Sequence, residues 1–330
     1  MSDLLKRIDE RTKLAGTNKL EILLFTLGVS KVTKRRETYG INVFKVREVM
    51  KTPPITAAPD MPPAVKGVVS LRGVLVPVVD LGEYVGVEPG SERNIMIITE
   101  YNGKVQGFLV ESVDTILRLD WSQIRVPPEM LTAKTGGLVT AVTELPDGRL
   151  VMLLDVERVL SDITKYDEAE DLYAGIEPLP DGDKYTVYFA DDSAVAREQI
   201  ERTLQKMGVR YVGAVNGRIA WENLEKAAER AKNTGRPITD FVSAVITDIE
   251  MPEMDGFILT KKIKSDRRFA GVPVLMHSSL SGMQNQYLGK SVGVDEYVPK
   301  FHPRELAETL QRLFAKRQET AKEGRDGQSA

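Results

Sequence analysis

The sequence contains no cysteine and only two histidines in 330 residues. Without thiols the chain can form no disulfide, no thiolate metal site and no cysteine nucleophile. Their absence also fits a reducing, cytoplasmic compartment. Because His277 and His302 are the only histidines, catalysis by paired or clustered imidazoles is severely restricted. These absences exclude several classes of enzyme before any motif is considered.

Long apolar runs and a strong charge of either sign are also absent. No apolar run approaches the length needed to span a bilayer, and the charged residues 1–10 do not resemble a secretory signal. The formal net charge of -3 gives no bulk electrostatic reason to expect nucleic acid or an anionic membrane as a partner. We therefore expect a cytoplasmic protein without direct membrane insertion, whose length suggests two domains.

The first half of the chain is typical of short strands separated by turns. Apolar, β-branched segments alternate with turn sequences such as Asn102-Gly103 and Asp147-Gly148. Many short strands with turns between them favour an all-β barrel or sandwich. We predict strands at residues 20–27, 38–43, 65–71, 75–79, 94–99, 105–111, 138–142 and 150–154, and short helices at 44–50 and 156–163.

The most distinctive stretch in this half is residues 67–81, which read GVVSLRGVLVPVVDL. Arg72 lies between two apolar runs and beside Gly73. An arginine on a rigid β scaffold can offer a forked donor to a partner's carboxylate or carbonyl. For this residue alone, a solvated turn is an equally good interpretation. The half contains no histidine, no phosphate-binding glycine loop and no convincing pair of acids, so binding is favoured over catalysis.

The same stretch resembles the signature of the CheW family of chemotaxis coupling proteins. The resemblance implies a pair of small β-barrels that help to join chemoreceptors to the histidine kinase CheA. It also implies a partner contact at Arg72. Ser70 stands where that family often has asparagine.

After residue 165 the composition changes twice. Residues 166–184 are acidic and contain two prolines, which predicts an exposed linker between a coupling domain at 1–165 and a second domain. Residues 185–315 then alternate strands with helices, one of them near residues 284–291, which predicts a doubly wound, five-stranded parallel sheet with helices on both faces. At the ends, residues 1–18 are expected to form a helix or arm, and the polar residues 316–330 a disordered tail.

Polar side chains follow successive strands of this predicted sheet. In a right-handed doubly wound sheet the carboxyl ends of all strands meet at one edge. We therefore expect these side chains to converge, although each residue alone would be an ordinary turn, cap or surface residue. They are Asp191 and Asp192 after the first strand, Asp248 after the third, Ser278 after the fourth and Lys300 after the fifth.

Converging carboxylates repel one another and raise a pKa unless a cation lies between them. Mg²⁺ prefers oxygen ligands in octahedral geometry and keeps several waters. The sequence therefore predicts a magnesium site with ligands from Asp191, Asp192 and Asp248. The backbone carbonyl of Glu250 is a further predicted ligand.

A metal and an ammonium beside Asp248 would allow it to act as a nucleophile toward a phosphoryl group. The hydroxyl of Ser278 can donate to a phosphoryl oxygen, and the Lys300 ammonium can neutralise charge on it. Such a modification adds roughly −1.5 to −2 charge. We expect it to bias a two-state element that includes Ser278 and Tyr297.

These positions resemble the motif of response-regulator receiver domains. In that family the acidic pair binds Mg²⁺, the central aspartate is phosphorylated, the hydroxyl and the aromatic residue switch, and the lysine contacts the phosphoryl group. This sequence departs from the family in having Phe301 where proline is common, and in a longer stretch at 221–240. The matching residues are Asp191-Asp192-Ser193, Asp248 with MPEMDG at 251–256, Ser278, Tyr297 and Lys300.

A coupling domain followed by a receiver resembles the CheV family of fused chemotaxis coupling proteins. The resemblance implies a non-enzymatic adaptor and phosphoprotein of a two-component system, which joins chemoreceptors to CheA within membrane receptor arrays. Neither histidine lies in an autokinase pattern, so CheA would be the phosphodonor, and the receiver would modulate coupling or act as a phosphate sink. Two alternatives stay open: a Mg²⁺-dependent phosphohydrolase with an aspartyl-phosphate intermediate, and a constitutive scaffold with an inert receiver.

Overall fold

The computed structural model describes residues 19–101, 104–120, 123–128, 137–164, 170–278 and 292–326. Contacts divide the chain into two compact units, Met1–Tyr166 and Asp167–Ala330, which we call the N-terminal and C-terminal units. The predicted arm at 1–18 and a helix expected near 284–291 lie outside the described residues. Among the helices that are described, none is long and apolar enough to cross a membrane.

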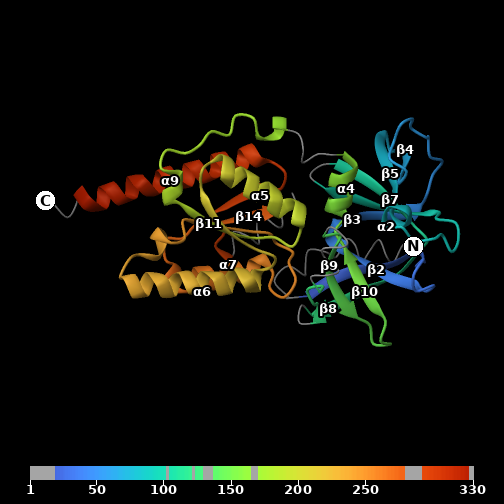
Figure 1. Cartoon of the computed structure of the whole chain (residues 1–330), viewed down its shortest axis with the longest axis horizontal. Coiled ribbons are helices and arrows are strands. Elements are labelled where there is room, and N and C mark those ends of the chain that lie inside the picture. The colour runs from blue at the N-terminus through green and yellow to red at the C-terminus, as the bar shows by residue number, and fades with distance from the viewer. Residues whose placement is uncertain are drawn as a thin grey trace. The chain divides into compact units, whose positions relative to one another are not determined.

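The N-terminal unit contains two five-stranded sheets (Figure 1). Most neighbouring strands are antiparallel, and only the β2–β10 and β5–β7 pairs are parallel. The first sheet has the order β8 (Ser112–Asp120), β1 (Lys19–Val29), β2 (Arg36–Asn42), β10 (Leu150–Leu154) and β9 (Val139–Glu144). The second has the order β3 (Val46–Lys51), β6 (Ile95–Tyr101), β7 (Lys104–Val110), β5 (Val74–Asp80) and β4 (Val65–Leu71).

The core of this unit draws on both sheets. Phe25 of β1 belongs to the same buried cluster as Ile97 of β6 and Phe108 of β7. The opposite face of each sheet is buried in a smaller cluster of its own. Because strands with two buried faces need apolar side chains on both sides, β1 is hydrophobic almost without alternation. The short helices are η2 (Val43–Lys45), α2 (Leu81–Val85) and α4 (Val156–Thr164).

The helix predicted at residues 44–50 is wrong. The chain forms one 3₁₀ turn, η2, and then strand β3, which pairs antiparallel with β6. Two β-branched valines, Val46 and Val49, favour the strand, and pairing with β6 satisfies its backbone. Strand β8 was not predicted at all, because its alternation of apolar and polar residues is imperfect. Its pairing with β1 supplies the missing stabilisation.

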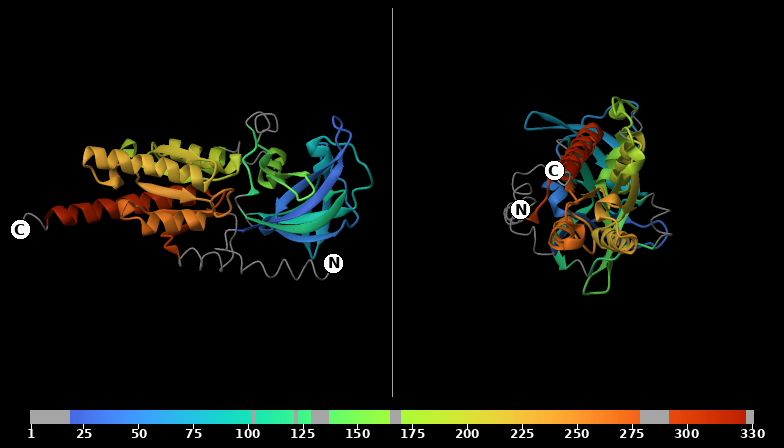
Figure 2. Two further views of the ribbon diagram at one scale, coloured as in Figure 1. Left: turned by 90° about the horizontal axis from the view of Figure 1, so that it is seen from below. Right: turned by 90° about the vertical axis from the view of Figure 1, so that its left-hand side faces the viewer.

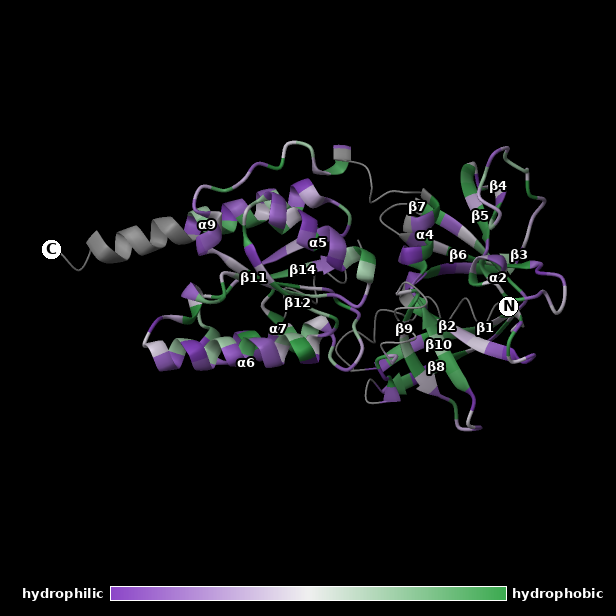
Figure 3. Cartoon of the chain, in the orientation of Figure 1, coloured by the Kyte–Doolittle hydropathy of each residue, from purple (hydrophilic) through white to green (hydrophobic). Residues whose placement is uncertain are grey.

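The C-terminal unit is built on one parallel sheet between two helical layers (Figures 1 and 2). Helices α5 (Ala194–Lys206) and α9 (Pro303–Asp326) cover one face, and α6 (Gly217–Thr234) and α7 (Gly256–Ser265) cover the other. Hydrophobic and hydrophilic residues are mixed along α6 (Figure 3), as expected of a helix with one face buried on the sheet. The strand order is β12 (Arg210–Ala214), β11 (Thr186–Ala190), β13 (Ala244–Thr247), β14 (Val274–Ser278) and β15 (Glu296–Pro299), which confirms the predicted doubly wound fold.

Side-chain caps fix where three of these helices begin. Ser193 accepts from the backbone of Ala196 at the start of α5, and Asn216 and Asp255 cap α6 and α7 in the same way. Helix α6 has 18 residues and ends at Gly235 in the left-handed conformation. The extra length noted in the sequence is therefore mainly helix, followed by the short turns η7 (Ile238–Asp240) and, later, η8 (Arg267–Phe269).

Much of the segment predicted as an exposed linker packs on the C-terminal unit. Residues 170–184 form the turns η5 (Glu170–Tyr173) and η6 (Gly182–Lys184). Tyr173 is 1% exposed, and the guanidinium of Arg202 lies 4.4 Å from its ring centroid. Arg304 donates to the carbonyl of Asp171 at 2.9 Å. The prediction followed the acidic composition of the segment and overlooked its few apolar side chains, such as Tyr173, which hold it on the C-terminal unit.

The disordered tail predicted from residue 316 is also wrong over most of its length. Helix α9 continues to Asp326 and extends beyond the sheet (Figures 1 and 2). Residues 315–323 contain no proline or glycine and are rich in Ala, Lys, Glu and Gln. These residue types have high intrinsic helix propensity, so a polar composition did not imply disorder here.

Candidate functional site

Three carboxylates converge at the carboxyl edge of the parallel sheet. Asp191 and Asp192 follow β11, and Asp248 follows β13, which lies beside β11. The amide of Asp248 donates to the carbonyl of Ala190 at 2.8 Å, so the pairing continues into the loops. One carboxylate oxygen from each aspartate lies within 4.8 Å of the other two. The structure thus brings together the side chains that the sequence predicted as metal ligands.

Lys300 joins two of these acids. Its Nζ lies 2.8 Å from Oδ2 of Asp191 and 3.1 Å from Oδ2 of Asp248. Lys300 is 1% exposed and Asp191 is 0% exposed, so both charges need a close partner to remain ionised. With Asp192 included, three carboxylates and one ammonium have a formal charge of −2 when all four are ionised. One divalent cation would balance this charge, and the all-oxygen donor set is the kind that Mg²⁺ prefers.

The loop after Asp248 approaches the next helix too closely for any side chain at Gly256. A Cβ on Gly256 would lie 1.9 Å from the carbonyl oxygen of Asp248. The preceding Asp255 caps α7 by accepting from the backbone of Ile258 at 2.7 Å, and burial raises the pKa of its carboxyl group. The Asp-Gly pair is therefore dictated by the cap and by the close approach, and it fixes the position of the loop.

Ser278 and Tyr297 meet beside the acids. Ser278 ends β14 and is 2% exposed. The parallel register pairs Met276 with Tyr297 and Ser278 with Pro299. Burial raises the pKa of Tyr297 to about 12, and a hydrogen bond with the Ser278 side chain opposes this rise. The predicted hydroxyl and aromatic residues are therefore in direct contact.

Glu250 and Phe301 also lie near the site. Glu250 lies in the β13–α7 loop and is half-buried; the use of its backbone carbonyl as a ligand stays a prediction. Phe301 follows Lys300, is 5% exposed and has a φ of 63°. A bulky residue in this left-handed region is strained by roughly 1–3 kcal/mol. The described backbone contains no cis peptide.

Arg197 is a site residue that the sequence reasoning missed. It lies on the first turns of α5, and its Nη1 donates to the carbonyls of Asp191 and Asp192, at 2.9 Å each. A basic residue so near a helix N-terminus opposes the helix dipole. This unfavourable position is the sequence feature that could have identified Arg197 as a site residue.

In the N-terminal unit, Arg72 lies at the tip of the β4–β5 hairpin. Arg72 and Gly73 form the two-residue turn, with φ values of 50° and 83°, as in turns that match the twist of paired strands. The Arg72 side chain is 77% exposed. Its Nη2 lies 3.3 and 3.2 Å from the two carboxylate oxygens of Glu48 on β3, a partner that the sequence did not reveal.

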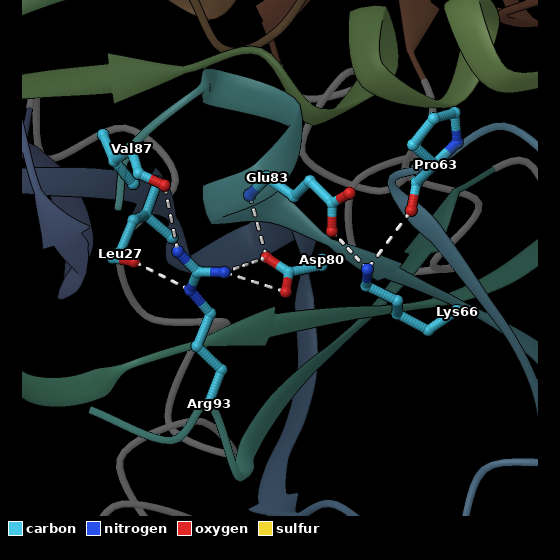
Figure 4. A network of polar contacts seen from close by, with 7 residues as sticks. All are labelled: Leu27, Pro63, Lys66, Asp80, Glu83, Val87 and Arg93. Atoms are coloured by element: carbon cyan, nitrogen blue, oxygen red, sulfur yellow. Dashed lines mark hydrogen bonds and ion pairs between the residues drawn. The ribbon is translucent and has the colours of Figure 1, made fainter. Parts of the chain in front are cut away.

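A buried ion pair links the two sheets of this unit (Figure 4). Nη1 of Arg93 donates to both carboxylate oxygens of Asp80, at 2.8 and 2.9 Å. Its Nε donates to the carbonyl of Leu27 on β1 at 2.8 Å, while Asp80 also caps α2 through the backbone of Glu83. At the edge of the same network, Lys66 pairs with the Glu83 side chain. The aspartate of the PVVDL stretch therefore has a structural role.

Comparison with known proteins agrees with this division of the chain. A CheW-like domain family matches residues 22–164, and the response regulator receiver domain family matches residues 187–311. The chain is 30% identical to chemotaxis protein CheV3 of Helicobacter pylori, over 84% of this chain and 89% of that protein. The chain belongs to the CheV family. CheV1 of the same organism is 27% identical, over 95% of this chain and 99% of CheV1.

As a member of the CheV family, the protein is a chemotaxis coupling adaptor with a receiver domain. Chemotaxis protein CheW of Klebsiella aerogenes is 35% identical over 46% of this chain and 87% of its own length. The predicted family and the predicted order, a coupling region followed by a receiver, are thus confirmed.

Proposed function

We propose that Asp248 of this CheV-family adaptor accepts a phosphoryl group and that this modification adjusts the coupling of chemoreceptors to the kinase CheA. The observation that carries the proposal is the buried Lys300 ammonium, which lies 2.8 Å from Asp191 and 3.1 Å from Asp248. This arrangement leaves a carboxylate nucleophile beside a fixed cation. The structural pair Arg93–Asp80 also places a cation beside a carboxylate, but at Lys300 a second and a third carboxylate lie close to the same cation.

Residues present at the sheet edge fit a magnesium ion. Asp192 and Asp248 would hold it directly, Asp191 would hold it directly or through water, and the carbonyl of Glu250 would complete the protein ligands. When bound, the ion would neutralise charge on the phosphoryl oxygens. The supporting observations are the 4.8 Å limit on the carboxylate separations and the formal charge of −2 of the four groups when ionised.

In the transfer step, a carboxylate oxygen of Asp248 attacks phosphorus and forms the new P–O bond. The bond between phosphorus and the donor's histidine nitrogen breaks, and that nitrogen keeps the electron pair. Lys300 donates to a phosphoryl oxygen and limits the build-up of negative charge. His277 is buried in β14 and His302 lies in the loop after β15, so we assign the donor to another protein; membership of the CheV family suggests the phosphohistidine of CheA.

The phosphoryl group would then compete for the hydroxyl of Ser278. In the unmodified protein that hydroxyl hydrogen-bonds Tyr297. The new acceptor oxygens carry roughly −1.5 to −2 charge and attract the hydroxyl more strongly than a neutral phenol does. Tyr297 loses a partner and gains freedom to change rotamer, which is how a local charge can bias a two-state element.

The N-terminal unit supplies the coupling surface. We assign a partner contact to Arg72, whose side chain is 77% exposed at a hairpin tip and whose forked donor group is aligned by Glu48. Through this unit the protein would bind receptor and kinase together and be located at receptor arrays. A phosphohydrolase is disfavoured because Glu250 stands where many such enzymes have a second aspartate.

A reconstitution of receptor, CheA and this adaptor tests the proposal. Wild type is compared with Asp248→Ala and with Asp183→Ala, which removes an exposed aspartate of the same unit. Wild type and Asp183→Ala should take up label from phosphorylated CheA and change kinase activity as they do so, whereas Asp248→Ala should do neither. Equal labelling of Asp248→Ala, with an equal change in coupling, would show the proposal to be wrong.

A further inference from the structure

Arg197 is held by the loop that carries two of the predicted metal ligands. The helix α5 begins after its cap, Ser193, and Arg197 lies four residues later. Instead of extending to solvent, its side chain turns back toward the helix start. There Nη1 donates to the carbonyls of both Asp191 and Asp192, at 2.9 Å each. One guanidinium nitrogen therefore fixes two consecutive peptide groups.

This position is unfavourable for a cation unless something compensates. The N-terminus of a helix carries partial positive charge, which repels an arginine in the first turns. Arg197 is also half-buried, so part of its hydration is lost. The compensation is the acidic edge of the sheet, where three carboxylates lie within 4.8 Å of one another. An arginine that served only the helix would be better placed at its other end.

The remaining contacts of the loop show what Arg197 adds. Oδ1 of Asp191 accepts from the amide of Ser193 at 2.9 Å, which sets the direction of that one carboxylate. The backbone amide of Asp191 donates to the carbonyl of Ala214 at 3.2 Å. Arg197 restrains the carbonyls of this turn from the helix side. With the peptide planes fixed, the two aspartate side chains are directed toward Asp248.

We propose that Arg197 is a positioning residue for the metal pocket: by holding the Asp191–Asp192 turn it sets the affinity of the receiver for Mg²⁺. The proposal rests on the proposed function, since it concerns the same pocket. Outer-shell groups that orient ligands commonly change metal affinity by about 10–100-fold when they are removed. We expect an effect near the lower limit, because the Asp191 side chain keeps its bond to Ser193.

A positioning role and a purely electrostatic role for Arg197 predict opposite changes in Mg²⁺ affinity when the residue is replaced. An experiment can therefore separate the two roles. If Arg197 acted only through its charge, removing it would leave the pocket more negative, and Mg²⁺ would bind more tightly. If Arg197 positions the ligands, removing it lets the turn relax, and Mg²⁺ binds more weakly. The direction of the change in affinity therefore separates the two roles.

The experiment is calorimetric titration of MgCl₂ into the full-length protein, with four forms compared. Arg197→Met keeps the aliphatic stem and removes the donors, Arg197→Lys keeps a cationic donor, and Lys206→Met removes an exposed charge from the last turn of the same helix. We expect about tenfold weaker binding for Arg197→Met, a smaller loss for Arg197→Lys, and no change for Lys206→Met. Far-UV circular dichroism verifies that each variant is folded.

A second readout separates positioning from chemistry. With a small-molecule phosphodonor, Arg197→Met should need about tenfold more Mg²⁺ for half-maximal labelling, yet approach the wild-type rate at saturating Mg²⁺. Unchanged or tighter Mg²⁺ binding by a folded Arg197→Met would overturn the inference alone. A wild-type protein that binds no Mg²⁺ would overturn both this inference and the proposed function. If Arg197→Met does not fold, wild-type affinity in Arg197→Ala would overturn it equally.

Discussion

Two buried charged sites, one in each unit, differ in the number of acids that share a cation. In the N-terminal unit the Arg93 and Asp80 side chains, 8% and 10% exposed, form a complete pair that also bonds to neighbouring backbone. In the C-terminal unit Lys300 serves two acids while a third lies close by. A balanced pair stabilises a fold and has no further electrostatic requirement, whereas an excess of negative charge needs a ligand. We interpret this imbalance, rather than burial itself, as the feature that separates the proposed phosphoacceptor site from the structural link.

The units also differ in where the residues assigned to function lie. Arg72 is exposed at a hairpin tip, where a partner protein can contact it. Asp248 and Lys300 are 5% and 1% exposed at the edge of a sheet. The first arrangement suits protein recognition, and the second suits phosphoryl chemistry in a site of low dielectric.

Removal of the Lys300 charge should have the largest effect. In Lys300→Met the remaining buried carboxylates are uncompensated, and breaking such a group typically costs about 3–5 kcal/mol. We expect the C-terminal unit to lose stability of that order in EDTA and to regain more stability from Mg²⁺ than wild type does. Urea denaturation with and without Mg²⁺ measures both quantities. Lys261→Met, at an exposed position on α7, is the control, and equal behaviour of the two variants would contradict the comparison.

Loss of the sheet-linking pair should come next. Arg93→Ala leaves Asp80 buried without the guanidinium nitrogen that contacts both of its oxygens, and we expect the N-terminal unit to lose about 3 kcal/mol. Mg²⁺ binding by the C-terminal unit should be unaffected. Lys66→Ala removes a partly exposed cation from the same network and should cost below about 1 kcal/mol. Equal losses of stability in the two variants would show that the burial of the Arg93–Asp80 pair does not increase its contribution.

The sequence predicted the convergent site better than it predicted the ion pairs. Asp191, Asp248 and Lys300 could be placed together because parallel strands have one common carboxyl edge. No such rule pairs Arg93 with Asp80, since their contact depends on how two sheets pack. Glu48 and Arg197 were missed for the same reason: each acts through a long side chain whose direction is set by tertiary structure.

The prediction of secondary structure was wrong where local sequence character and tertiary contacts disagreed. No Gly or Pro separates strand β2 from residues 44–50, so the sequence gives no sign of a new strand there, and the pairing of β3 with β6 stabilises one. Tyr173 lies in an acidic segment whose composition suggested a flexible linker, yet its ring is buried. In both places a few long-range contacts outweighed the average character of the segment.

A smaller effect is expected at Glu111, with a defined dependence on pH. Burial acts to raise the pKa of Glu111, but hydrogen bonds from Arg36, Ser91 and Thr26 outweigh it and hold the pKa below its ordinary value of 4.5. A lowered carboxyl pKa stabilises the folded state above the unfolded value, and this contribution is lost as the pH falls through the folded value. Glu111→Gln should therefore cost about 1–3 kcal/mol at pH 7.

The test is denaturation of wild type and Glu111→Gln over a descending pH series. Their difference in unfolding free energy should shrink below pH 4.5, where the carboxyl group of the unfolded chain becomes protonated. Glu100→Gln, at an exposed carboxylate that pairs with Arg47 on the surface, should show a small difference at all pH values. A Glu111→Gln difference that stays constant with pH would refute the assignment.

The smallest change in stability is expected for Arg72→Ala. Its ion pair with Glu48 is exposed on the arginine side, and such pairs contribute below about 1 kcal/mol. Because alanine tolerates the turn conformation about as well as arginine does, folding should be nearly unchanged while coupling of receptor to kinase falls. Arg149→Ala, which removes another exposed arginine of this unit, should leave coupling intact. If Arg72→Ala couples receptor to kinase as well as wild type does, the hairpin tip is not part of the partner surface.

Asp248 is the carboxylate whose chemistry the proposed function requires. The protein is incubated with a small-molecule phosphodonor in Mg²⁺ or in EDTA, the acyl phosphate is reduced with borohydride, and the modified residue is located by peptide mass spectrometry. We predict modification at Asp248 in Mg²⁺ and none in EDTA. Modification at another residue, or at Asp248 to the same extent without Mg²⁺, would contradict the claim that the imbalanced acids form a metal-dependent phosphoacceptor site.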